Sequence, residues 1–355
     1  TTTTAVPTTT TQTPATTTTA VPTTTTQTPA TTMAPVKIVK AATQCISDSP
    51  VEIIQCTKQI AESAFTTTRE HLENSNQDDL DFNFLVAPNA PISHVTNVKN
   101  ALTPGVTFWS FQLPSDQAST LFILTGEDLD WFFEEMTALG LNGSFEAETE
   151  EKLRDGTRGL GVAYNRPALD GSKVVAFINF SVFESFITPG LASRNAAIQV
   201  AAHEWTHLVQ GVLSENVFNS PCWWTEGSAE FFSTIPSLRE QVQNYDDYLT
   251  VRIGHVKANL DDRSVARTRQ ITDWVDWLKI SECSKSSYGA GYLAAEYLVG
   301  QYGFTAAVEI MKLIGPEMSW EAAIEQVYGT PYFDLLTEIA KHLKYVFSST
   351  EYLSN

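Results

Sequence analysis

The chain has 355 residues, of which 43% are hydrophobic and 18% are charged, and its formal net charge is −19. This is enough material for one large folded domain or two modest ones. The strong negative charge argues against nucleic acids and anionic membranes as partners, because both would be repelled. No apolar run approaches the length of about 18 residues that a membrane span needs, so no span is expected.

The N-terminal segment differs in composition from the rest of the chain. Residues 1–30 are two identical copies of TTTTAVPTTTTQTPA, and residues 1–35 contain no charged side chain. Thr and Pro dominate, so this segment cannot bury a core. We expect a disordered Thr-rich tail that acts as an extended, O-glycosylated stalk, with a plain linker as the alternative. The chemistry is therefore expected in residues 36–355.

Cysteines and glycosylation sequons indicate the compartment. The chain has four cysteines, Cys45, Cys56, Cys222 and Cys283. Four cysteines allow three disulfide connectivities. The pairing that is local in sequence joins Cys45 to Cys56 and Cys222 to Cys283. Together with the Thr-rich stalk and the N-x-S/T sequons at Asn142 and Asn179, it favours an oxidising extracellular location, either secreted or at a cell surface.

The first part of the domain, residues 36–192, mixes helical and strand patterns. The predicted elements in chain order are a helix at 46–72, a strand at 82–86, a helix at 94–102, a strand at 121–124, a helix at 127–139 and a strand at 173–182. Thr125-Gly-Glu-Asp128 begins the third of these helices and Gly140 ends it. The last strand is the most distinct, since its β-branched and aromatic residues run nearly unbroken.

The second part, residues 193–355, reads as helices alone. The predicted helices are 196–213, 225–236, 289–301, 304–314, 319–328 and 332–347. Strands with helices, followed by helices only, predict an α+β fold with a small mixed sheet and an all-helical C-terminal part.

The helix predicted at 196–213 carries the motif H203-E-W-T-H207. Positions i and i+4 lie on one face of a helix, so both imidazoles can point at one metal ion. Glu204 is rotated by about 100° from His203, which suits a base acting on a water that the metal activates. The alternative is a helix with two surface or core histidines. The apolar and small residues around the pair weaken that alternative, because buried polar groups need partners.

A catalytic zinc site needs a third protein ligand, and W223-W-T-E-G-S-A229 supplies a candidate in Glu226, which follows His207 after 18 intervening residues. This arrangement resembles the gluzincin metallopeptidases, and the W-x-x-E-G-x-A segment is similar to that of the aminopeptidase N branch. The resemblance covers about residues 196–300. It implies a zincin-like fold, His203, His207 and Glu226 as ligands of Zn²⁺, and Glu204 as the general base.

Glu230 lies one helical turn after Glu226. It is either a second-layer acceptor that fixes the tautomer of His203 or, less favoured, the third ligand itself. Thermolysin-like gluzincins have an acidic residue at this spacing in the former role.

The segment S287-Y-G-A-G-Y292 resembles the Y-x-x-G helix start of the aminopeptidase N branch, whose Tyr stabilises the oxyanion. Tyr288 is the expected donor and Tyr292 the runner-up, whereas Tyr297 and Tyr302 are expected in the core. A disulfide between Cys222 and Cys283 would tie the Glu226 helix to the Tyr288 helix.

One feature of that branch is missing. Its G-x-M-E-N segment binds the free amino terminus of the substrate, and none of Met33, Met136, Met311 and Met318 lies in such a segment. Aminopeptidase specificity is therefore not supported. The expected substrate-pairing edge strand remains, with 174–182 as its candidate and a central strand as the alternative.

The sequence thus predicts a secreted zinc metallopeptidase that cleaves peptides or proteins. A non-catalytic extracellular binding or adhesion module on a peptidase-like fold is the alternative, and hydrolysis of a non-peptide bond is a third. The remaining histidines lack paired spacing and are expected to be structural or at the surface: His71, His94, His255 and His342.

Overall fold

The chain divides into two units, residues 1–36 and residues 37–355. The computed structural model describes only residues of the second unit, namely 50–75, 82–113, 118–143, 145–164, 166–179, 191–215, 219–238, 248, 269–280, 283–315 and 318–348. The Thr-rich repeats, Cys45 and His255 lie outside the described residues. No helix in the described part of the chain has both the length and the apolar character needed to cross a membrane.

The sheet has four strands in the order β1-β2-β4-β3. Their bounds are β1 Phe82–Val86, β2 Ser119–Leu124, β3 Leu160–Ala163 and β4 Lys173–Ile178. The strands β1, β2 and β4 are parallel, and β3 is antiparallel to β4 at the edge. Both central strands are buried at every residue, as expected for nearly continuous apolar runs.

The interior place of β4 corrects one expectation. The segment 174–182 was the candidate for the substrate-pairing edge strand, but β4 is hydrogen-bonded on both sides, to β2 and to β3. Its unbroken apolar character is the physical reason, because a strand covered on both faces belongs inside a sheet. The edge next to β4 is β3, a four-residue strand with a glycine, which the sequence pattern did not reveal.

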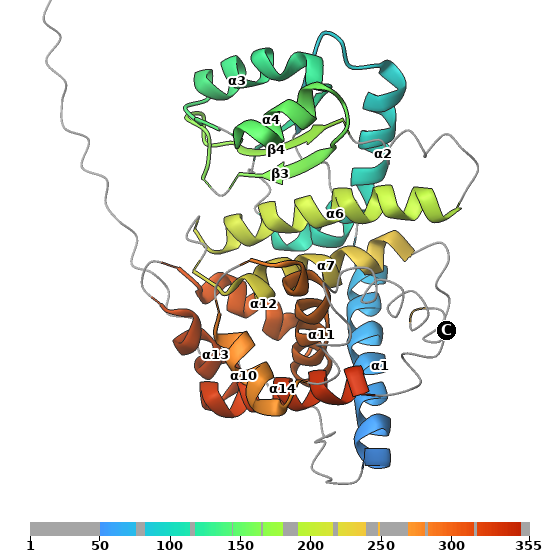
Figure 1. The fold of residues 1–355 in the computed structure, drawn as a ribbon, viewed down its shortest axis with the longest axis vertical. Coiled ribbons are helices and arrows are strands. Elements are labelled where there is room, and N and C mark those ends of the chain that lie inside the picture. Colours follow the sequence, from blue (N-terminus) through green and yellow to red (C-terminus); the bar gives the residue numbers. More distant parts are fainter. Residues whose placement is uncertain are drawn as a thin grey trace, which may run out of the picture. The chain divides into compact units, whose positions relative to one another are not determined.

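Helices cover both faces of the sheet (Figure 1). The helices α2 (Ile92–Trp109) and α6 (Leu191–Leu213) lie on one face, and α3 (Leu129–Ala138) and α4 (Ala147–Arg154) on the other. Alternate residues of β4 serve the two cores: Val175 and Phe177 pack in the core shared with α6, whereas Val174 and Ala176 pack against α3.

Helix boundaries follow local signals in this part of the chain. A capping box between Thr125 and Asp128 starts the short helix η2 (Gly126–Asp128), which leads into α3. Gly140 has a φ of +72° just past the end of α3, as a helix stop requires. The helix α2 extends through Pro104 to Trp109, seven residues past its predicted end at 102, and continues into η1 (Ser110–Gln112). Its last turns are buried, so tertiary packing outweighs the cost of an internal proline.

The second half of the unit is helical, as predicted. Its helices are α7 (Cys222–Leu238), α10 (Ile271–Lys279), α11 (Lys285–Tyr302), α12 (Phe304–Leu313), α13 (Trp320–Tyr328) and α14 (Tyr332–Ser348), and α1 (Pro50–Asn74) packs against α11 and α14. The pattern predicted most of these helices within a few residues, but it did not identify α4 or α10. The α+β class is thus confirmed, with a small mixed sheet and a helical C-terminal part.

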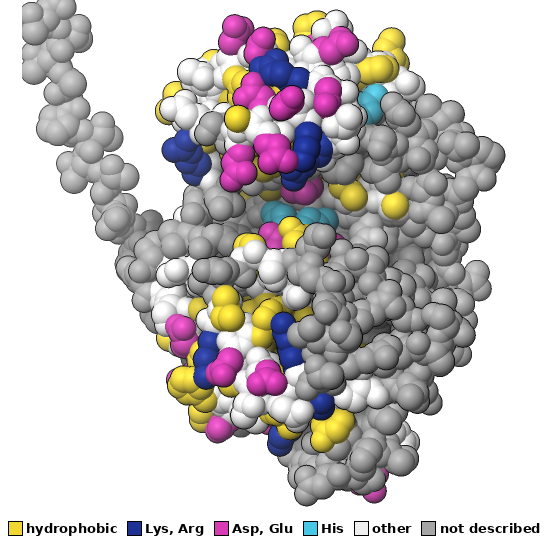
Figure 2. Space-filling view, viewed as in Figure 1, with side chains coloured by type: hydrophobic (Ala, Val, Ile, Leu, Met, Phe, Trp, Pro, Cys, Tyr) yellow, Lys and Arg dark blue, Asp and Glu magenta, His cyan; other side chains and the backbone are white. Residues whose placement is uncertain are grey.

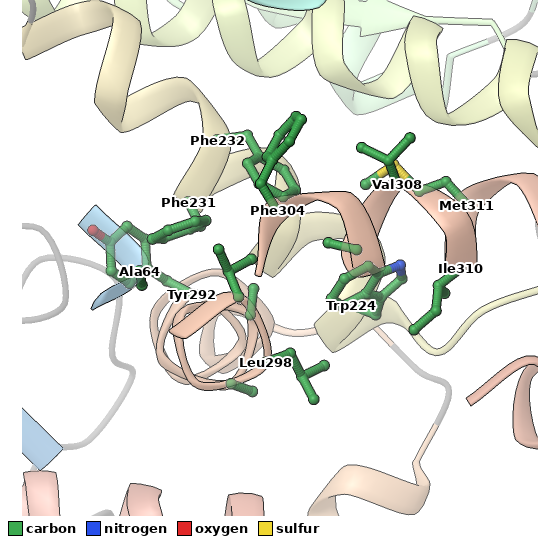
Figure 3. Packing of buried hydrophobic residues seen from close by; sticks show 14 of the residues in the cluster. Ala64, Trp224, Phe231, Phe232, Tyr292, Leu298, Phe304, Val308, Ile310 and Met311 are labelled. Atoms are coloured by element: carbon green, nitrogen blue, oxygen red, sulfur yellow. The ribbon is translucent and has the colours of Figure 1, made fainter. Parts of the chain in front are cut away.

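The helix α11 runs through the centre of this half and is buried on all sides from Gly289. Figure 3 shows Phe231 and Phe232 of α7 near Tyr292 of α11 and Phe304 of α12. The ring centroids of Phe231 and Tyr292 are 5.4 Å apart, and those of Phe232 and Phe304 are 5.5 Å apart. Aromatic contacts thus hold α7 against both α11 and α12.

A glycine pair lets α7 and α11 approach closely. A Cβ atom on Gly227 would lie 2.2 Å from the carbonyl carbon of Gly291, and one on Gly291 would lie 2.4 Å from the carbonyl oxygen of Trp223. Side chains at these positions would force the helices apart. The crossing places the first turn of α7, with Glu226, next to the first turn of α11, with Tyr288.

Candidate metal centre

His203 and His207 lie one turn apart on α6, the helix between the sheet and the helical half of the unit. An alanine-rich stretch, A196-A-I-Q-V-A-A202, favours the helix and fits closely against its neighbours. The Nε2 atoms of the two rings are 3.0 Å apart. Figure 2 shows histidine side chains in a hollow between the part of the surface over the sheet and the part over the helices.

Glu226 of α7 reaches the same point. Its Oε2 atom lies 3.3 Å from Nε2 of His203 and 3.3 Å from Nε2 of His207. These three side chains form a group that could hold a metal ion. His207 and Glu226, with 18 residues between them in sequence, meet here because α6 and α7 pack side by side.

The other ring nitrogens have acceptors. Nδ1 of His203 lies 2.9 Å from Oε2 of Glu230, and Nδ1 of His207 lies 2.8 Å from Oε1 of Gln210. The amide nitrogen of Gln210 donates to the carbonyl oxygen of Thr225 at 3.0 Å and to Oγ of Ser228 at 2.8 Å. A carbonyl oxygen only accepts, so the amide orientation is determined and Oε1 faces His207.

Both Nδ1 atoms therefore carry the proton, and in the neutral rings both Nε2 atoms present lone pairs. Two such nitrogens and a carboxylate oxygen face one another at 3.0–3.3 Å, an arrangement that could hold a cation between them. Tetrahedral ligands about 2.0–2.1 Å from a zinc ion lie about 3.3–3.4 Å apart. The donor types and their spacing thus fit Zn²⁺.

The pKa shifts also show that the site attracts positive charge. Burial by itself lowers the pKa of His203, but hydrogen bonds to Glu226 and Glu230 outweigh it and hold the pKa well above its usual range. Burial by itself raises the pKa of Glu226, but hydrogen bonds from His203 and His207 hold it far below its usual range. A cation, either a proton or a metal ion, is therefore favoured between these groups.

Glu204 lies beside the three donors, where α6 meets β3. A Cβ atom on Gly161 of β3 would lie 2.7 Å from Cγ and 2.8 Å from Oε1 of Glu204. A side chain at position 161 would therefore displace the Glu204 carboxylate or the strand. Burial raises the pKa of Glu204, although the nearby charges of His203 and His207 act in the opposite direction. A raised pKa suits a carboxylate that accepts and returns a proton near neutral pH.

Tyr288 of α11 reaches the cluster from the opposite side. Its hydroxyl hydrogen-bonds to Glu226, and its ring centroid lies 5.9 Å from that of His203, nearly parallel to it. Burial, followed by the charge of Glu226, raises the pKa of the Tyr288 phenol well above its usual value. The hydroxyl therefore stays protonated at neutral pH and remains a donor.

The other tyrosines of α11 have different surroundings. Tyr292, the runner-up, is fully buried with its hydroxyl 2.7 Å from that of Tyr248. Tyr297 donates to Glu338 at 2.9 Å, and the ring of Tyr302 lies 4.2 Å from that of Tyr328. Tyr288 is thus the tyrosine of α11 that contacts Glu226 and His203.

The disulfide Cys222–Cys283 is present, with 5.2 Å between the two Cα atoms. It joins the first residue of α7 to the residue that precedes Ser284, the N-cap of α11. Cys56 is also disulfide-bonded, and Cys45, its expected partner, lies outside the described residues. The bridge thus connects the helix of Glu226 to the helix of Tyr288.

The remaining histidines of the described part, His71, His94 and His342, belong to no group of three metal-ligating side chains there. His71 hydrogen-bonds the carbonyl oxygen of Phe108 at 2.8 Å and stacks on Phe304 at 4.0 Å. It therefore has a packing role.

Two contributors to the site were not identified from the sequence. Gln210 stands three residues after His207, on the same side of the helix, and that spacing is a signal that could have revealed it. Gly161 gave no local signal, because its role depends on the approach of a strand to a helix.

Comparison of the chain with known protein families, with curated proteins and with solved structures finds no match.

Proposed function

We propose that this protein is a zinc-dependent metallopeptidase of the gluzincin type. The observation that carries the proposal is the convergence of three lone-pair donors, from His203, His207 and Glu226, at 3.0–3.3 Å from one another. A carboxylate with a raised pKa and a protonated phenol flank these donors. A zincin-like fold for residues 37–355 is part of the same proposal.

Zinc, when bound by these three side chains, would supply a Lewis acid that polarises the attacking water and the peptide carbonyl. Glu204 accepts the proton of that water and then delivers it to the leaving amine. Tyr288 turns its hydroxyl from Glu226 to the developing oxyanion and stabilises it by a hydrogen bond. His203 and His207 keep their Nδ1 protons on Glu230 and Gln210 throughout.

The edge strand β3 is our candidate for the surface that binds the substrate backbone. Among the described strands it pairs with β4 alone, so its other side offers backbone donors and acceptors to an extended peptide. Because Gly161 lies against Glu204, a peptide on this edge would pass close to the proposed base. The strand β3 thus takes the place of the segment 174–182 as the candidate for the substrate-pairing strand.

We further propose an extracellular location. The Cys222–Cys283 disulfide requires an oxidising compartment to form and persist. The Thr-rich stalk of residues 1–35 is typical of secreted or cell-surface proteins.

The proposal is tested with a peptide library, in the presence and absence of a chelator, and with Glu204→Gln. Cleavage should disappear with the chelator and return with zinc. The variant should retain one zinc ion per chain but lose cleavage, because the amide cannot accept the proton. Full activity of Glu204→Gln would refute the mechanism, and a zinc-free protein would favour the binding-module alternative.

A further inference from the structure

A second set of metal-ligating atoms lies next to the first. The sulfur atoms of Cys222 and Cys283 and a carboxylate oxygen of Glu226 all lie within 4.8 Å of one another. Glu226 also belongs to the group with His203 and His207. The disulfide therefore stands beside the acidic ligand of the proposed zinc site.

The chemistry of this second set depends on the oxidation state of the sulfurs. In the disulfide each sulfur is bonded to the other, and neither can supply a thiolate to a metal ion. When reduced, two thiolates and one carboxylate make a donor set that suits zinc and other thiophilic ions.

We propose that the Cys222–Cys283 disulfide masks a second metal site, formed by Cys222, Cys283 and Glu226, which becomes available on reduction and takes the metal from the histidine site. The reductant in this step is a small-molecule or protein dithiol. It transfers two electrons and two protons to the bridge, the S–S bond breaks, two cysteine thiols form, and the dithiol closes to its own disulfide. Both thiols release their protons to solvent when they bind the metal.

The two sites compete because they share one ligand. With one metal ion per chain, Glu226 completes either the histidine set or the sulfur set, and thiolates are ligands that zinc favours. Reduction should therefore leave His203 and His207 without their third ligand. Reduction should then also abolish peptide cleavage. That expected loss rests on the proposed function, whereas the sulfur site itself does not.

A reductant can reach the disulfide, and Cys283 can move once the S–S bond is broken. Cys283 is exposed, so a reductant can reach the bridge, whereas Cys222 is buried at the start of α7. Cys283 precedes the N-cap of α11, outside the helix, and can shift toward Glu226 without unwinding a turn. The same shift would release the start of the helix that carries Tyr288.

The test uses the full chain with Co²⁺ as the probe, because cobalt bound to thiolates shows an intense charge-transfer band in the near ultraviolet. The protein is loaded with one equivalent of Co²⁺, before and after reduction with a phosphine. The phosphine takes up the oxygen of one water molecule to become the phosphine oxide, and the two hydrogens of that water end on the two cysteine thiols. The band should be absent from the oxidised protein and appear at one site per chain after reduction.

Matched variants identify the sulfurs. Cys222→Ser/Cys283→Ser retains Cys45 and Cys56 and should show no band after reduction, whereas Cys45→Ser/Cys56→Ser should show the full band. His203→Ala/His207→Ala should retain the band as well. A band lost in the histidine variant would overturn the proposal, because the thiols would then only add to the first site. A band in the Cys222/Cys283 variant, or none in reduced wild type, would overturn it too.

Folding and function are followed separately. Circular dichroism and thermal melting of each oxidised and reduced sample show whether the fold persists, and the band is interpreted only for samples that remain folded. If one of the two cysteine double variants does not fold, the other is sufficient to identify the sulfurs that bind cobalt. The band needs no substrate, so its absence refutes the second site and leaves the peptidase proposal intact. Absence of zinc-dependent cleavage in the oxidised protein refutes the peptidase and leaves the second site intact.

Discussion

The carboxylate of Glu230 lies 2.9 Å from Nδ1 of His203, so the glutamate one turn beyond the proposed third ligand orients the first ligand. Both side chains are largely buried, which makes this hydrogen bond stronger than a similar pair in water. It holds the His203 ring in the tautomer that presents Nε2 to the metal.

Glu230→Ala should weaken zinc binding by about 10- to 100-fold, the usual cost of losing an outer-layer partner of a ligating histidine. Glu230→Gln retains an acceptor oxygen and should lose less. Zinc affinity is measured by competition with a chromophoric chelator, with thermal melting as the check on folding. Equal affinities for the wild type and Glu230→Ala would show that the contact does not support the metal site.

Tyr288→Phe should lower kcat by about 100- to 1000-fold while zinc remains bound, because one donor to the oxyanion is removed. The matched control is Tyr292→Phe, which removes the hydroxyl one turn along the same helix, where it meets Tyr248. The control should lower stability and spare kcat. If Tyr292→Phe loses activity and Tyr288→Phe does not, the donor has been assigned to the wrong tyrosine.

Gly161→Ala should reduce peptide cleavage at least about tenfold with the zinc content unchanged. The added methyl would lie 2.7–2.8 Å from Cγ and Oε1 of Glu204, so either the carboxylate or β3 must move. Val162→Ala serves as the control, because Val162 packs in the core with α3, on the other face of the sheet. Metal analysis and steady-state kinetics measure the effect, and unaltered kcat/KM in Gly161→Ala would contradict the predicted contact.

Lys173 should make the stability of the fold depend on pH. It is buried at the start of β4, and its Nζ atom has no hydrogen-bond partner within the described residues. Burial lowers its pKa from 10.5 to about 8. The unfolded chain therefore binds more protons than the folded chain between pH about 8 and about 10.5, and the contribution of Lys173 to stability rises with pH across this window.

Below this window both states carry the charge, and the folded state bears the full cost of burying it. Lys173→Met should accordingly raise the free energy of unfolding at pH 7 by about 3 kcal/mol at most, and the gain should shrink as the pH approaches 10.5. Denaturant unfolding at several pH values measures it. Lys341→Met, at an exposed position of α14, is the control. A gain that is the same at every pH would contradict the lowered pKa.

Several features of the site could be predicted from the sequence because they depend on local periodicity. The spacing of His203 and His207 places them on one helix face wherever the helix lies, and the same holds for Glu226 and Glu230. The pairing of Cys45 with Cys56, which are close in sequence, left Cys222 to pair with Cys283, and the structure confirms this second bridge. The α+β order followed from the change of hydrophobic period near residue 193.

Other features depend on which segments meet, and this is decided only by tertiary packing. The most strand-like segment, 173–178, became a central strand, and the four residues 160–163 became the edge beside Glu204. The roles of Gly161 and Gln210 appear only once β3 lies against α6 and α7 lies beside it. H203-E-W-T-H207 by itself thus determines two converging nitrogens, since a helix repeats every 3.6 residues. The third donor, the base contact and the nearby sulfurs converge there because helices and strands distant in sequence bury their apolar faces against one another.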